Sequence, residues 1–128
     1  MKILIFVLIT LTAFSAHANP CDGIDRKLTG NRKSQLAPII AKQLSIESVE
    51  IFDLFKYRGW YIILVETHIS DEPFLIFKGD PVYNTYTTMW SGAAANFEGP
   101  EIKKWVLNNA KGIPAKLARC FAWHVTQE

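Results

Sequence analysis

The chain has 128 residues, with 14 lysines and arginines against 12 aspartates and glutamates, and it contains two cysteines. This length fits one domain with a single core, and the near balance of charge, without a long basic run, argues against nucleic-acid binding. No phosphate-binding loop, zinc tetrad, calcium loop or paired-glycine nucleotide motif occurs, so the sequence predicts neither a metal nor another cofactor.

The first eighteen residues are typical of a secretory signal peptide. Lys2 gives a positive start, an apolar run follows from Ile3 to Leu11, and Ala16 to Ala18 supply small residues for cleavage. The apolar core is shorter than the roughly 20 residues that a membrane-spanning helix needs. We therefore predict signal cleavage, a mature single domain of residues 19–128 without a membrane anchor, and a periplasmic or secreted location.

A helix is predicted over residues 34–45, after a polar opening. Ser34 has the side chain of an N-cap, and Pro38 is tolerated near a first turn. Leu36, Ile40 and Leu44 recur at helical spacing and form one apolar stripe.

The segment from Glu47 to Trp90 has the composition of β-structure. Runs rich in valine, isoleucine, threonine and aromatic residues alternate with turn residues, which predicts strands at Val49–Lys56, Trp60–His68, Phe74–Lys78 and Val82–Trp90. Short turns join them, so we expect an antiparallel meander. The second strand is apolar on both faces and should be an inner strand covered on each side, whereas the polar fourth strand should lie at an edge.

Two helices are predicted to end the chain. Pro100 suits the first position of one helix, which Lys111 and Gly112 end, and Pro114 opens the other. The predicted fold class is α+β: a four-stranded antiparallel meander packed by one N-terminal helix and two C-terminal helices.

Cys21 and Cys120 lie near the two ends of the mature chain. In an oxidising compartment two cysteines are most simply one disulfide, which here would join the chain start to the last helix. Cys120 and His124 also have the spacing of two ligands on one helix face, but a zinc site needs further ligands. The sequence predicts the disulfide and no metal site.

Glu66, His68 and Asp71 form the best candidate for chemistry. Glu66 and His68 are two residues apart on a predicted strand, so their side chains should share a face as a carboxylate–imidazole pair. The alternative is a strand end that emerges into water. No nucleophile can be placed beside the pair, and we predict no catalytic residue.

A partner-binding surface is predicted on the fourth strand. Tyr83, Tyr86 and Trp90 lie among asparagine and threonines, a composition that recognition surfaces use. Further candidates lie at loop tips, where inhibitors present a side chain to an enzyme: Arg58, Lys78 and Asp80. The alternative for the aromatic residues is a sheet face that the helices cover. The alternative for the loop-tip residues is an ordinary solvent-exposed turn.

Three functions remain open from sequence. The preferred hypothesis is a small exported, non-enzymatic protein, of bacterial periplasmic type, that binds another envelope protein as an inhibitor or as an immunity protein against an enzyme or toxin. The alternatives are an envelope protein that carries a small ligand or lipid, and a small hydrolase that uses Glu66 and His68.

Overall fold

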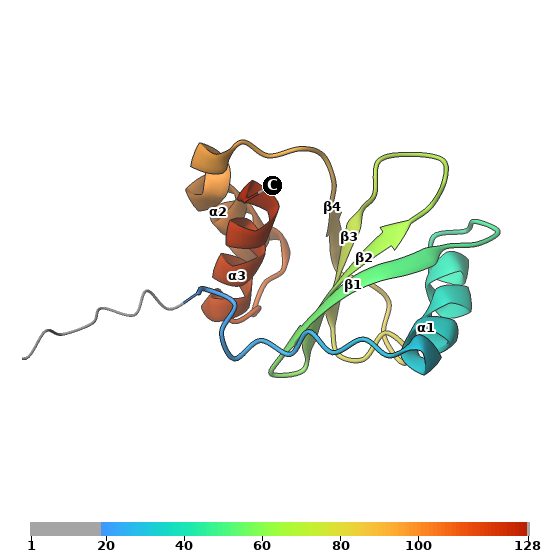
Figure 1. Ribbon diagram of the computed structural model, residues 1–128. Helices are drawn as coiled ribbons and strands as arrows, with labels where there is room; N and C mark the ends of the chain where they lie inside the picture. Colours follow the sequence, from blue (N-terminus) through green and yellow to red (C-terminus); the bar gives the residue numbers. More distant parts are fainter. Residues whose placement is uncertain (1–18, 128) are drawn as a thin grey trace, which may run out of the picture.

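A four-stranded antiparallel sheet separates one helix from a pair of helices in the computed structural model, which describes residues 19–127 (Figure 1). The predicted signal peptide, residues 1–18, lies outside the described residues. Along the chain the elements are α1 (Gly30–Gln43), β1 (Glu50–Tyr57), β2 (Trp60–Glu66), β3 (Phe74–Lys78), β4 (Thr88–Trp90), the 3-10 turn η1 (Asn96–Glu98), α2 (Gly99–Asn109) and α3 (Ala115–Thr126). The strands pair in the order β1-β2-β3-β4, which confirms the predicted α+β meander and its three helices.

Strand β2 is an inner strand with both faces covered, as its apolar sequence predicted. Successive strand side chains point to opposite faces of a sheet. Ile63 is fully buried in a cluster with Leu36 and Ile40 of α1, whereas Ile62 is fully buried in a second cluster with Phe121 of α3. The core therefore has two halves, one on each face of the sheet.

Helix α1 begins earlier than residue 34, where the sequence analysis placed its cap. The N-cap is Thr29, whose hydroxyl accepts a hydrogen bond from the backbone N–H of Arg32 at 3.1 Å. Pro38 consequently lies inside the helix and not in its first turn, so that prediction was wrong. The proline cannot donate to the carbonyl of Ser34, and both residues are exposed to solvent.

The fourth strand is much shorter than the predicted Val82–Trp90. Only Thr88–Trp90 pairs with β3, because turn and side-chain contacts hold the preceding residues. The Asp80 carboxylate accepts from the N–H of Val82, and its backbone carbonyl accepts from the N–H of Tyr83. The side-chain amide of Gln43 in α1 bonds backbone groups of Pro81, Asn84 and Tyr86. The segment thus forms a loop against α1, although β4 is an edge strand as predicted.

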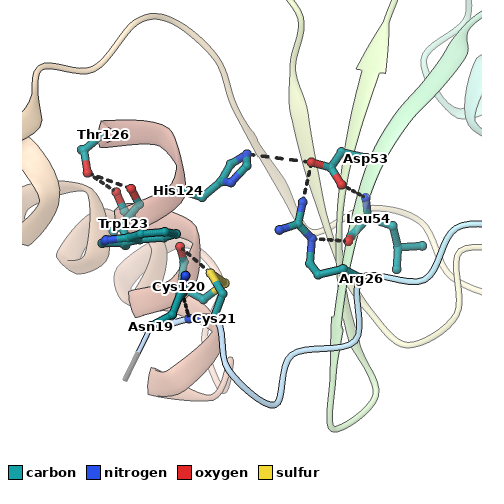
Figure 2. Close-up of a disulfide and its surroundings, with 10 residues drawn as sticks. Asn19, Cys21, Arg26, Asp53, Leu54, Cys120, Trp123, His124 and Thr126 are labelled. Carbon is teal, nitrogen blue, oxygen red and sulfur yellow. Dashed lines mark hydrogen bonds and ion pairs between the residues drawn. A yellow bond between two sulfur atoms is a disulfide. The ribbon is translucent and has the colours of Figure 1, made fainter. Parts of the chain in front are cut away.

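The predicted disulfide is present between Cys21 and Cys120, whose Cα atoms are 4.6 Å apart. Cys120 is fully buried on α3, and Figure 2 shows the bond holding the first described residues against this helix. From there the chain pairs with β1 through backbone hydrogen bonds between Asp25 and Lys56, and then enters α1. One N-terminal segment therefore connects the two helical layers (Figure 1).

Replacing both cysteines by serine should lower the free energy of unfolding by about 3–5 kcal/mol, because the bond closes a loop of about 100 residues in the unfolded chain. Urea unfolding of residues 19–128 would measure the change. The protein with its native cysteines, once reduced, should behave like the double variant. Equal stability of the oxidised protein and the double variant would contradict this prediction.

Candidate binding groove

The end of the sheet near the β2–β3 loop borders an open cleft of about 520 Å³. Its apolar floor is Leu64 and Phe74, which lie opposite one another on β2 and β3. One wall carries three carboxylates, and the other is the segment after β4. We call this the acidic cleft; its lining residues are Leu64, Glu66, Ser70, Asp71, Glu72, Phe74, Gly92 and Ala93.

Glu66 is held as an anion at the mouth of this cleft. Its pKa is lowered, chiefly because the backbone N–H of His68 donates to Glu66 Oε1 at 2.6 Å, and next because of a hydrogen bond with the side chain of Glu72. Glu50 of β1 lies directly opposite Glu66 in the sheet register. Negative charge therefore gathers at this end of the sheet.

His68 was expected from the sequence to share a strand face with Glu66, and this expectation was wrong. Strand β2 ends at Glu66, and His68 lies in the following loop with a φ of 63°, in the left-handed region. Its side chain is 63% exposed, and its Nδ1 is 3.7 Å from Glu66 Oε1. Of the three predicted polar residues, Glu66 and Asp71 line the cleft, and His68 lies beside Glu66 outside the lining.

A smaller aromatic pocket of about 160 Å³ adjoins the acidic cleft and shares Phe74, Gly92 and Ala93 with it. Its other lining residues are Trp90, Ala94, His124 and Val125. The ring of Trp90 packs edge-on against Phe121, with centroids 5.6 Å apart. Because they share Phe74, Gly92 and Ala93, the acidic cleft and the aromatic pocket are treated as one continuous feature, which we call the groove; it is acidic at one end and aromatic at the other.

His124 is oriented by a cluster that joins three segments of the chain (Figure 2). Its Nε2 is 3.8 Å from the carboxylate of Asp53 in β1, and its ring lies edge-on to Phe55 at 4.9 Å. Arg26 of the N-terminal segment pairs with the same carboxylate, donates to the carbonyl of Leu54 and lies 3.7 Å from the Phe55 ring centroid. The cluster fixes α3 and the N-terminal segment against β1.

Sequence reasoning missed Arg26 and Asp53. The sequence did contain one indication of a charged partner, because Asp53 is a charged residue between the apolar residues Phe52 and Leu54 of a predicted strand. The register of β1 against β2 shifts between Ile51 and Asp53, and after this irregularity Asp53 lies opposite Leu64. The partner Arg26 is distant in sequence, so the pairing had no local pattern.

Tyr83, Tyr86 and Trp90 do not form one surface. Tyr83 is 86% exposed in the turn before β4, whereas Tyr86 packs edge-on against Phe77 on the α1 side of the sheet. Trp90 packs into the cluster beside α2 and α3, on the other side. The expectation that all three lie on the fourth strand was wrong for Tyr83 and Tyr86, because residues 82–87 leave the sheet. A role of the three residues in partner binding stays a prediction.

The loop-tip candidates lie at the opposite end of the sheet from the acidic cleft. Arg58 is exposed in the β1–β2 turn, and Lys78 is exposed at the end of β3, opposite Trp60. Asp80 instead pairs with Arg32 of α1 at 2.7 Å, so its carboxylate holds the turn against the helix. A role of Arg58 and Lys78 in partner binding stays a prediction.

Within residues 19–127 there is no group of three or more histidine, cysteine, aspartate or glutamate side chains arranged to hold a metal ion. Over the same residues, no helix has the length and apolar character to cross a membrane. Comparison with protein-family models, curated proteins and solved structures finds no match to this chain. The groove is therefore interpreted from its own geometry and charge.

Glu66→Gln should lower stability more at neutral than at acid pH. Because the pKa of Glu66 is lowered in the folded state, its contribution is present above the ordinary value of 4.5 and is lost as the pH falls through the folded value. Glutamine carries no charge at either pH. Urea unfolding of both proteins at about pH 7 and about pH 3 would test this; an equal difference at the two pH values would contradict it.

Proposed function

We propose that this protein is a small exported, non-enzymatic binding protein of the bacterial envelope, and that its groove receives a basic segment of another envelope protein. The observation that carries the proposal is the groove itself, with carboxylates at one end and Trp90 and Phe74 at the other. An arginine or lysine side chain has the matching chemistry, because its charged head pairs with carboxylates and its aliphatic stem packs on apolar surface.

The shape of the groove supports a protein partner. The acidic cleft is broad and open to solvent, so a loop from another molecule can enter without a conformational change. Gly92 and Ala93 have no long side chain to obstruct it. The groove walls are also anchored, since His124 and Phe74 pack on Phe55 and Phe121 respectively. A preorganised surface loses little entropy on binding, which favours affinity.

Export is part of the proposal. The apolar N-terminal segment and the small residues before Asn19 support signal cleavage, and the Cys21–Cys120 disulfide is consistent with an oxidising compartment. A small disulfide-bonded protein that binds one partner in the envelope is suited to act as an inhibitor of an enzyme or as an immunity protein against a toxin.

The two alternatives have less support. A general acid benefits from a raised pKa, whereas that of Glu66 is lowered, and the imidazole of His68 is mostly in solvent. A carrier of an apolar ligand needs space between sheet and helices. Side chains occupy that space on both faces, where Ile62 and Ile63 are completely buried.

The direct test is affinity capture from an envelope fraction with the oxidised mature protein as bait. We expect one stoichiometric protein partner whose affinity falls about tenfold or more when Glu66→Gln and Glu72→Gln are combined, because a buried charged pair loses its anionic half. Glu47→Gln is the matched control, since Glu47 is an exposed carboxylate in the α1–β1 connection and is not among the groove's lining residues. It should retain full affinity.

Two results would contradict the proposal. One is a partner that binds the wild type and the Glu66→Gln/Glu72→Gln variant equally well, which would place its site elsewhere. The other is turnover of an envelope substrate by the purified protein that His68→Ala abolishes without a change in melting temperature, which would support the hydrolase.

A further inference from the structure

The charge of this protein is unevenly distributed between its layers. From residue 99 to residue 126, which spans α2, α3 and their connecting turn, five lysines and arginines accompany one acidic residue, Glu101. The rest of the described chain is net acidic, with carboxylates gathered at the groove. A basic patch of this kind favours a negatively charged partner.

Two of these cations, Lys103 and Arg119, line one cleft between α2 and α3, whereas Lys104 lines another cleft with Trp90, and Lys116 Nζ lies 5.6 Å from the centroid of the Tyr57 ring in β1. Lys116, Arg119 and Trp123 are spaced by three and four residues on α3 and so share one side of the helix, away from the buried stripe of Leu117 and Phe121. Figure 2 shows Trp123 on the side of α3 that faces away from the sheet, whereas His124 points toward it. Trp123 and the groove therefore lie on different sides of α3.

A shallow cleft of about 420 Å³ lies on this outer face, between α2 and α3. Trp123 lines it together with Lys103 and Arg119, and its remaining walls are mostly small or apolar. Neither cation forms an ion pair with another residue of the described chain, 19–127. Phe97, which follows the lining residue Asn96, is 80% exposed. The two cations thus share a cleft with the half-buried Trp123, next to a chain segment that exposes Phe97.

The mature chain would also begin at this face. Pro20 lines the cleft between α2 and α3, and Asn19 lines an adjoining cleft together with Lys116 and Arg119. Asp22 is the acidic residue of the adjoining cleft.

We infer that the face formed by Phe97, Lys103, Arg119 and Trp123, the lipid face, rests on a membrane surface that contains anionic phospholipid. Basic side chains are attracted to the negative surface potential, and exposed aromatic rings enter the interfacial region. The contact is peripheral and reversible, and it requires no anchor. It is independent of the groove, so a membrane-bound molecule can still receive a protein partner.

Sedimentation with lipid vesicles tests the inference on oxidised residues 19–128. We expect binding to vesicles of phosphatidylcholine mixed with phosphatidylglycerol, no binding to phosphatidylcholine alone, and weaker binding as salt is raised. Combining Lys103→Gln with Arg119→Gln should reduce the partition coefficient about 25-fold, because each cation near the surface contributes about fivefold. Phe97→Ser should also weaken binding, although it leaves the charge unchanged.

The matched control combines Lys33→Gln with Lys42→Gln, which removes the same charge from exposed positions of α1, on the other face of the sheet, and should leave vesicle binding unchanged. Equal binding to both kinds of vesicle would overturn the inference. An equal loss in the control would also overturn it, since net charge alone would then explain the binding. Glu66→Gln/Glu72→Gln should bind vesicles normally, so failure of the groove proposal and failure of this inference are distinguishable. Circular dichroism would establish that each variant is folded.

Discussion

The disulfide between Cys21 and Cys120 is the constraint on which the rest of the arrangement depends. It holds the first described residues against α3, and the following residues then pair with β1 and continue to α1. This path brings Arg26 to β1, where it pairs with Asp53. The same carboxylate lies beside His124, which forms a wall of the groove. The disulfide therefore positions the N-terminal segment, and through Arg26 and Asp53 this segment helps to position His124 in the wall of the groove.

Opposite charges on separate faces give the molecule two different surfaces. The anionic end of the groove lies beside the β2–β3 loop, and the cationic lipid face lies on the far side of α3. Such a separation favours simultaneous contacts with unlike partners, because neither contact covers the other. It also orients the protein: with its helical layer on a membrane, the groove would remain accessible from the aqueous side.

Local patterns predicted the regular elements and failed where distant residues decide the backbone. The bounds of β3, Phe74–Lys78, agree with the prediction because turn residues flank a short apolar run. The fourth strand was predicted to be too long, because Gln43 and Asp80 form hydrogen bonds with backbone groups that would otherwise pair within the sheet. Glu66 was identified from sequence as a polar candidate. The left-handed backbone conformation at His68, which directs the following loop, could not be predicted because no local sequence pattern indicates it.

The central claim is that the chain leaves the cytosol and is closed by its disulfide. Mass spectrometry of the native protein, isolated from cell fractions in the presence of a thiol-alkylating reagent, tests it most directly. The account predicts an envelope or secreted species that begins at Asn19, with Cys21 and Cys120 unreactive until a reductant is added. A cytosolic chain that retains Met1 and has both cysteines alkylated in the native state would contradict it.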